Sequence, residues 1–234
     1  MKKVLTLLLL LNSFVAHAQH SYSVSDKKAA NVKAAMVKAM GGKKALKAIN
    51  YFSYTILRTS YGTDTTTTRS SYTLNLRKQY IQEKQYVNGG AVTKWIGEDG
   101  AWAVENGIKT SLPQTEKQRL QRTFYTNFVP MLQNKELVYE HKYETVYKGR
   151  PVDIIRVYAP QKKDLIMDLF VDSDNGKILT SSKPDIKTGE YLYFADELDY
   201  QAVGKGVIFP LIYQVWVKGK LVSEGKFVDI EVKQ

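Results

Sequence analysis

The chain has no cysteine and only three histidines among its 234 residues. Without cysteine it can form no disulfide, and it lacks the residue that carries the acyl chains of a bacterial lipoprotein. His17 and His20 lie near the N-terminus, so His141 is the one histidine in the body of the chain. A zinc site built from several His or Cys ligands is therefore excluded, and we expect no metal.

Long apolar runs are also scarce, and the first 18 residues contain the clearest one. Two lysines precede the run Val4–Leu11, and a small-x-small site, Ala16-His17-Ala18, precedes Gln19. This pattern is typical of a secretory signal peptide, and the run is shorter than the roughly 20 residues of a membrane helix. We therefore expect cleavage near Ala18/Gln19, after which residues 19–234 form a single soluble, unlipidated domain in the periplasm.

Signatures of common enzymes are missing as well. No Gly-x-Ser-x-Gly elbow is present to expose a serine beside His141, which is interpreted as a histidine on a strand face. Gly204-Lys205-Gly206 lacks the rest of a phosphate-binding loop and precedes a strand. These absences predict a protein that is not an enzyme and that has no cofactor.

The acidic residues do not form a convincing catalytic or metal site. Asp172, Asp174 and Asn175 precede Gly176, but Lys183 stands where a calcium loop needs a bidentate glutamate, so this segment is interpreted as a hairpin turn. Asp196 and Glu197 are neighbours on a predicted strand, and neighbouring side chains point to opposite faces. They therefore cannot act as a facing acid pair.

The formal charge is +11, and loss of the two lysines of the signal peptide would leave +9. In an exported protein such a charge favours anionic surfaces such as lipid headgroups, and it makes nucleic acid an unexpected partner. The lysines are scattered along the chain, so solubility alone is an alternative explanation.

The hydrophobic periodicity predicts two helices followed by a long series of strands. The first helix should run from Asp26 to Met40 and end at Gly41-Gly42, and a short second one should follow from Lys43 to Ile49. The inward face of the first helix consists of Ala29, Val32, Met36 and Met40. Period-two patterns then predict strands at Tyr51–Tyr61, Thr66–Lys78, Gln79–Val87, Ala91–Gly97, Ala101–Glu105, Lys135–Tyr147, Val152–Ala159, Leu165–Val171, Lys177–Ser182, Glu190–Leu198, Phe209–Val217 and Leu221–Val232.

One aromatic helical segment, Pro113 to Asn134, interrupts the strands. Its apolar face consists of Leu120, Phe124, Phe128 and Met131. Pro130 removes a helical hydrogen-bond donor, so we expect a break after Phe128 and two short helices instead of one rod. Such an insert either fills a core or closes over an apolar pocket.

Large aromatic side chains are frequent in the predicted strands. They include Trp95, Trp102, Phe170, Tyr191, Tyr193, Phe194, Tyr213 and Trp216. Aromatic residues suit both a packed core and the wall of an apolar cavity, so the sequence leaves both interpretations open.

The order of these elements resembles the LolA-like family of periplasmic lipoprotein carriers and outer-membrane lipoprotein-sorting proteins. The likeness depends on Gly41-Gly42 with Ala45–Ile49, on Leu169–Asp172 through Asn175–Leu179, and on Gly206–Pro210. It implies a mainly β chain with helices (α+β), in which one strongly bent antiparallel sheet forms an unclosed β-barrel beneath a helical lid. It also implies a cavity arginine that holds the lid, for which Arg58, Arg69 and Arg77 are candidates.

The resemblance implies a carrier that holds the acyl chains of a lipid or lipoprotein, with a role in outer-membrane lipoprotein sorting. The residues predicted to bind lipid are Trp95, Trp102, Leu120, Phe124, Phe128, Met131, Phe170, Tyr193, Phe194 and Trp216. The alternative is a non-enzymatic, RseB-like sensor or scaffolding module whose sheet is filled by its own side chains. Such a module would bind another envelope protein, and transient contacts with envelope proteins or an anionic membrane surface are expected in either case.

Overall fold

The computed structural model describes residues 27–87, 90–160, 164–185 and 188–234. The predicted signal peptide and the predicted start of the first helix at Asp26 lie outside these residues. Within the described ranges, no helix has the length and apolar character needed to cross a bilayer.

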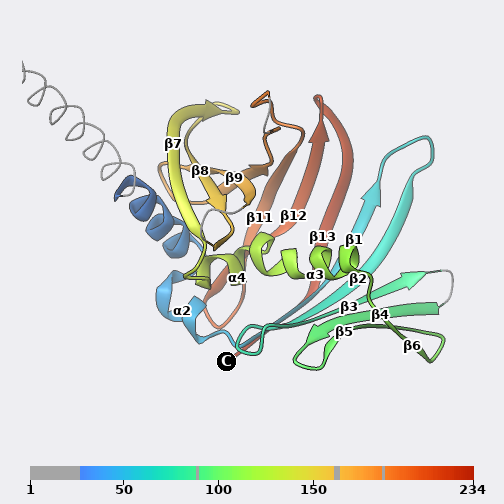
Figure 1. The fold of residues 1–234 in the computed structure, drawn as a ribbon. Helices are drawn as coiled ribbons and strands as arrows, with labels where there is room; N and C mark the ends of the chain where they lie inside the picture. Colours follow the sequence, from blue (N-terminus) through green and yellow to red (C-terminus); the bar gives the residue numbers. More distant parts are fainter. Residues whose placement is uncertain (1–26, 88–89, 161–163, 186–187) are drawn as a thin grey trace, which may run out of the picture.

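Among the described residues, thirteen strands form one antiparallel sheet, in the order β6-β5-β4-β3-β2-β1-β13-β12-β11-β10-β9-β8-β7. The strands are β1 (Tyr51–Ser60), β2 (Thr66–Asn75), β3 (Tyr80–Val87), β4 (Gly90–Gly97), β5 (Gly100–Glu105), β6 (Ile108–Ser111), β7 (Val138–Tyr147), β8 (Arg150–Tyr158), β9 (Leu165–Asp172), β10 (Ile178–Ser182), β11 (Phe194–Gly204), β12 (Val207–Val217) and β13 (Lys220–Lys233). The sheet curves strongly, and its edge strands β6 and β7 do not pair with each other (Figure 1). The expected unclosed β-barrel is therefore confirmed.

The helices lie mainly against one side of this sheet (Figure 1). Residues 27–39 are helical, and α2 (Gly42–Ala48), α3 (Gln114–Thr126) and α4 (Phe128–Gln133) follow. The central segment is broken at Asn127, whose side chain accepts a hydrogen bond from the Val129 backbone N–H. The prediction of two helices is confirmed, but the predicted break after Phe128 is wrong, since Phe128 is the first residue of α4. Pro130 falls in the first turn of α4, where a missing N–H costs little, so it does not break the helix.

One strand was not predicted from the sequence, and another was predicted with the wrong bounds. β6 (Ile108–Ser111) was missed, because a strand of four exposed residues has no apolar alternation to detect. The strand expected at Glu190–Leu198 is β11 (Phe194–Gly204) instead. It continues past Leu198 to Gly204, and its largely exposed second half lacks the apolar alternation that marks a strand. Its pairing with β12 shifts register between Ala202 and Gly204.

The main core lies between the sheet and the helices, on the side of the sheet that we call the inner face. The predicted face of the first helix is confirmed, since Ala29, Val32, Met36 and Met40 are all buried. From the sheet, Phe52, Leu74, Ile81, Ile155 and Phe209 complete this core. Each such side chain contributes roughly 1.5–3 kcal/mol through removal from water.

A close backbone approach joins the helices to the sheet. A Cβ on Gly41 would lie 1.9 Å from the Gly206 carbonyl oxygen, and Gly41 has a φ of +105°. The Ile208 N–H donates to the Met40 carbonyl at 3.1 Å. Only glycine fits at position 41, which explains why the predicted stop of the first helix falls there.

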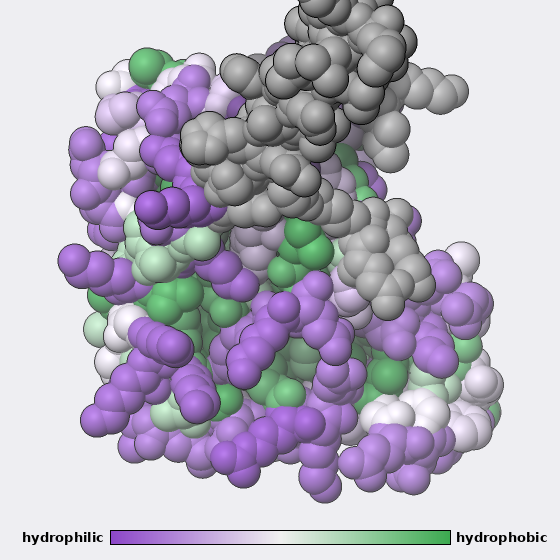
Figure 2. All heavy atoms as spheres, turned by 60° about the vertical axis from the view of Figure 1, so that its left-hand side comes forward, coloured by the Kyte–Doolittle hydropathy of each residue, from purple (hydrophilic) through white to green (hydrophobic). Residues whose placement is uncertain are grey.

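The opposite, outer face carries a smaller cluster built on Val152, Ile154 and Phe170. Figure 2 views the molecule from the side of α2 and β7, and the visible surface there carries long hydrophilic side chains with apolar patches between them. The chain thus buries apolar side chains on both faces of the sheet, but the inner cluster is the larger one.

Candidate functional site

Helix α3 crosses the inner face and contacts β3, β4 and β9 (Figure 1). Leu120 on α3 and Met131 on α4 are fully buried, and Phe128 is nearly so. Phe124 packs against the same core while remaining partly exposed. These four residues, predicted from their helical spacing, therefore share one apolar face against the sheet.

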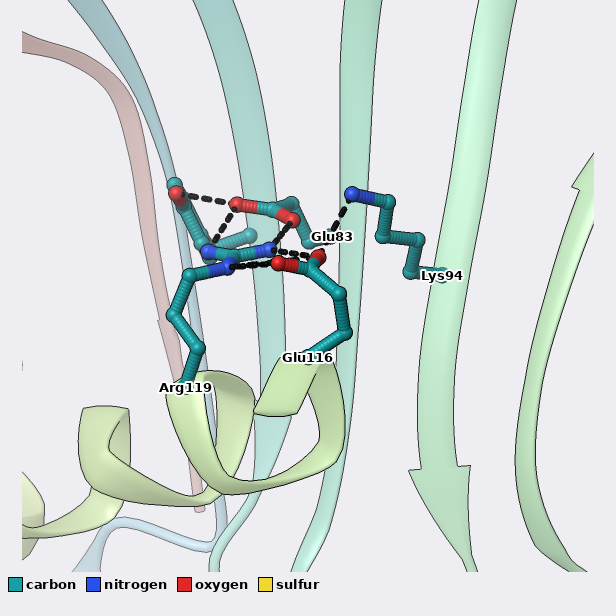
Figure 3. Close-up of polar contacts among 5 residues, drawn as sticks. Glu83, Lys94, Glu116 and Arg119 are labelled. Atoms are coloured by element: carbon teal, nitrogen blue, oxygen red, sulfur yellow. Dashed lines mark hydrogen bonds and ion pairs between the residues drawn. The ribbon is translucent and has the colours of Figure 1, made fainter. Parts of the chain in front are cut away.

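A charged network also holds α3 to the sheet, and we call it the Glu83 network (Figure 3). Glu83 on β3 is fully buried, yet its carboxylate accepts two hydrogen bonds from the Arg119 guanidinium, one of them at 3.0 Å. The Tyr72 hydroxyl donates to the same carboxylate at 2.5 Å. Glu116 joins Arg119 to Lys94 on β4, whose ammonium donates to Glu116 at 2.7 Å.

Local geometry explains why these groups meet. Glu83 lies two residues beyond the buried Ile81 on β3, so both point to the inner face, and Tyr72 is its direct cross-strand partner on β2. Glu116 and Arg119 are three residues apart, which places them on one face of α3. The network therefore ties two strands and a helix together by one buried carboxylate.

The electrostatics of the network follow from burial and pairing. Hydrogen bonds from Lys94 and then Arg119 hold the pKa of Glu116 below its usual range. Burial, followed by the neighbouring Glu83 charge, raises the pKa of Tyr72 well above that of an ordinary phenol. Tyr72 is thus a hydrogen-bond donor at any physiological pH, which suits a carboxylate partner.

Two hollows flank α3. One of about 430 Å³ lies beside Arg119 and is bounded on the sheet by Ile56, Arg58, Ser70 and Tyr213. The other, of about 490 Å³, lies beside Phe124 and Tyr125, towards α4. Both volumes fall in the range of small-ligand sites, roughly 300–1,000 Å³. The helix therefore separates two openings on the same inner face.

None of the three arginine candidates makes a hydrogen bond or ion pair to α3 or α4 within the described part of the chain. Arg58 donates to Ser223 at 3.4 Å, Arg69 pairs with Asp229 on the surface, and Arg77 lies exposed after β2. The guanidinium that joins helix and sheet belongs to Arg119, on the helix itself. The sequence offered no signal for it, because its partner Glu83 is 36 residues away.

Two of the three tryptophans predicted to bind lipid, Trp95 and Trp102, lie on the outer face of strands β4 and β5. On β4, Lys94 and Ile96 face α3 and the core, so the intervening Trp95 points the other way. Trp102 is its cross-strand partner on β5, and the Lys109 ammonium lies over both rings. The structure does not bring this pair together with the aromatic face of α3 and α4.

Three further predicted residues also lie on the outer face. Phe170 and Phe194 pack edge to face at 5.7 Å, and Trp216 is the cross-strand partner of Phe194. Tyr193, one residue before Phe194, lies near enough to Arg122 of α3 for that charge to oppose the rise in its pKa that burial causes. The ten predicted residues are therefore divided between the two faces and do not line one cavity.

The one cluster of described residues with metal-ligating potential contains His141, Glu144 and Asp153, whose ligand atoms lie within 4.8 Å of one another. The Lys28 ammonium already contacts Glu144 at 2.9 Å and Asp153 at 3.1 Å. Burial alone would raise the pKa of Asp153, but hydrogen bonds from Lys28, Ser173 and His141 hold it below its usual range. We interpret this cluster as an anchor for the first helix.

The predicted hairpin turn before Gly176 is confirmed. The Asp172 carboxylate accepts the backbone N–H groups of Asp174 and Asn175, which is the geometry of an Asx turn. Gly176 has a φ of +73° and lies against the backbone of Ala35 in the first helix. The Asp172 carboxylate therefore shapes the turn, and the turn places Gly176 against the first helix.

Neither a protein-family model nor a curated protein matches the chain. Solved structures do resemble it. A DUF1329 family protein from Desulfovibrio piger matches at a TM-score of 0.55 and 10% identity, over 87% of this chain and 92% of its own. A LolA superfamily protein from Nitrosomonas europaea matches at 0.57 and 11%, over 84% and 93%.

A structure described as an outer membrane lipoprotein-sorting protein domain, from Vibrio parahaemolyticus, matches at a TM-score of 0.57 and 11% identity, over 89% of this chain and 94% of that one. At such low identities the likeness concerns the fold. The bent, unclosed sheet with helices across its inner face is therefore the LolA-like fold.

Proposed function

We propose that this protein is a periplasmic carrier that holds the acyl chains of a lipid or lipoprotein between the inner face of its sheet and helices α3 and α4. The observation that carries the proposal is the way α3 is held. An apolar helix face covers an apolar sheet face, polar contacts fasten it at Glu83, and hollows open on both sides. A ligand can therefore enter by displacing a helix without breaking the sheet.

Burial supplies the binding energy, with no chemical step. Each CH₂ removed from water contributes about 0.8 kcal/mol, so a chain of several methylenes can offset the loss of contacts made by Leu120 and Phe124. The Glu83 network then opposes opening, because separating Arg119 from a buried carboxylate is costly. Contact with a partner would shift this balance and release the ligand.

The names of the structural neighbours support this role. One is described as a LolA superfamily protein and another as an outer membrane lipoprotein-sorting protein domain. We extend to this chain the general role of holding lipid or lipoprotein in the cell envelope, including outer-membrane lipoprotein sorting.

Native mass spectrometry of the protein purified from periplasm, followed by lipid analysis after denaturation, tests the proposal. We expect stoichiometric lipid or acylated peptide on the native protein. Mature protein that carries nothing, and that takes up neither added fatty acid nor phospholipid, would contradict the carrier role.

A sensor or scaffolding module is the second candidate, and one observation favours it. Leu120, Phe128 and Met131 are almost fully buried, so they already fill space between the helices and the sheet. Replacing Phe128 by alanine separates the two functions. A filled core predicts a loss of about 3–5 kcal/mol in unfolding free energy with no change in lipid retention. A carrier predicts that retention falls as well.

A further inference from the structure

A row of cross-strand partners crosses the inner face of the sheet. In register across five strands it runs from Thr68 on β2 through Arg58 on β1, Gly225 on β13 and Tyr213 on β12 to Glu197 on β11. Direct cross-strand partners share one face, so this row lies on a single surface. Arg58, Thr68 and Tyr213 border the 430 Å³ hollow beside α3.

Glycine at the centre of the row allows Tyr213 to lean towards Arg58. A Cβ on Gly225 would lie 2.1 Å from Cε1 and 2.5 Å from the hydroxyl oxygen of Tyr213, so the ring lies directly over the glycine. Arg58 is the cross-strand partner of Gly225 on its other side. Its positive charge acts on Tyr213, opposing the rise in the pKa of the hydroxyl that burial causes.

The polar groups of this row have unused hydrogen-bonding capacity. Arg58 makes no ion pair with any described carboxylate, and its one hydrogen bond is the long contact of 3.4 Å to Ser223. The Tyr213 hydroxyl and the Glu197 carboxyl have no hydrogen-bond partner among the described residues. By contrast, Arg119 on the far side of the hollow is fully engaged by two carboxylates.

Glu197 does not neutralise Arg58 at neutral pH. Burial, with a smaller contribution from the neighbouring Asp196, raises the pKa of Glu197 to about 8. The carboxyl is therefore mostly protonated and uncharged at pH 7. Three other charged side chains line the hollow, but Arg69 pairs with Asp229 and Arg119 pairs with Glu83. Among the described residues, Arg58 is therefore the charged group of this hollow that lacks an ion-pair partner.

We propose that Arg58 and Tyr213 form a subsite for a carboxylate or phosphate group, and that this group is the head of the amphiphile whose acyl chain lies in the hollow beside α3. A guanidinium fork and a phenol O–H both donate, which matches the acceptor oxygens of such a group. The inference rests on the proposed carrier function, since it names the class of ligand carried: an anionic, single- or multi-chain amphiphile.

Calorimetric titration of the mature protein with ligands of one chain length tests the subsite. The probes are laurate, dodecyl phosphate, the uncharged glycerol ester of lauric acid, and inorganic phosphate without a chain. The variants are Arg58→Met, which keeps the aliphatic stem, Tyr213→Phe, which removes only the hydroxyl, and Arg77→Met as a matched control in the exposed turn after β2. Circular dichroism melts establish that each variant is folded.

We expect wild-type protein to bind laurate and dodecyl phosphate roughly tenfold or more tightly than the uncharged ester. Arg58→Met should remove this preference while leaving the affinity for the ester within about twofold of wild type, and Arg77→Met should change neither. Tyr213→Phe should weaken the anionic ligands by a few-fold.

The outcomes separate the subsite from the carrier function. If all amphiphiles bind equally and Arg58→Met has no selective effect, the subsite is refuted and the carrier function stands. If inorganic phosphate binds as tightly as dodecyl phosphate and depends on Arg58, the site takes free anions, and the assignment to a lipid head is overturned. If no amphiphile binds, the carrier function fails together with the headgroup assignment.

Discussion

Replacing Arg119 by methionine should be the most informative single change to the helix–sheet contact. The substitution keeps the stem of the side chain and removes the guanidinium, which leaves the Glu83 carboxylate fully buried with Tyr72 as its remaining donor. Removing one partner of a buried ion pair costs about 3–5 kcal/mol. Because Arg119 is 41% exposed, solvent screens part of the interaction, and we expect a loss of about 2–4 kcal/mol.

Urea unfolding of the mature protein measures this loss as a change in midpoint at constant slope. Arg122→Met is the matched control, since Arg122 lies exposed one turn along the same helix, and it should change stability by less than about 0.5 kcal/mol. The double variant Glu83→Gln/Arg119→Met should recover much of the loss, because no uncompensated charge is then buried.

Two results would refute this reasoning. Arg119→Met could be no more destabilising than Arg122→Met, which would mean that the buried ion pair contributes nothing. Alternatively, the double variant could lose as much unfolding free energy as Glu83→Gln and Arg119→Met lose together when each is made alone. That result would mean that Glu83 and Arg119 act independently. Under the proposed function, Arg119→Met should also shorten the retention time of bound lipid, whereas Arg122→Met should not.

Three further predictions concern other parts of the inner face. Because burial raises the pKa of Glu197 to about 8, its ionisation opposes folding, so stability should fall as the pH rises from about 4.5 to 8. Glu197→Gln should flatten that fall, by up to about 1 kcal/mol per pH unit, in melting temperatures recorded against pH. Leu120→Ala should cost about 2–5 kcal/mol in urea unfolding, since Leu120 is fully buried, and a loss below about 1 kcal/mol would show that α3 is not packed as described. Gly225→Ala should destabilise by roughly 1–3 kcal/mol, because the new methyl group meets the Tyr213 ring, and combining it with Tyr213→Ala should recover stability in the same assay.

Local patterns were sufficient to predict much of the fold. The buried positions of the first helix, Ala29, Val32, Met36 and Met40, follow from a 3.6-residue period that only one helix face can satisfy. Asp172 and Gly176 marked a turn, and the structure shows the hydrogen bonds that make it. Such features depend on residues close in sequence, so the sequence alone determines them.

The faces of the sheet and the charged contacts were harder to predict. The period-two pattern assigns Trp95 and Trp102 to one face of their strands. It does not say which of the two apolar faces of the sheet the helices will cover. The end of β11 beyond Leu198 was missed because most of its residues are exposed and show no apolar alternation. The pair of Glu83 with Arg119 depends on where α3 crosses the sheet, which is a tertiary property with no local signal.

The central pairing of the sheet sets the order in which the chain can assemble. β1 and β13 are neighbours in the middle of the sheet and pair from Tyr51↔Lys233 to Ser60↔Ser223, with one register shift between Ser53 and Thr55. Each half of the meander can form from nearby strands, but closing the loop between β1 and β13 carries the largest entropic cost. We therefore expect the two halves to unite only once residues 220–233 are free to pair, so that loss of this last strand leaves two exposed sheet edges where the intact protein has its centre.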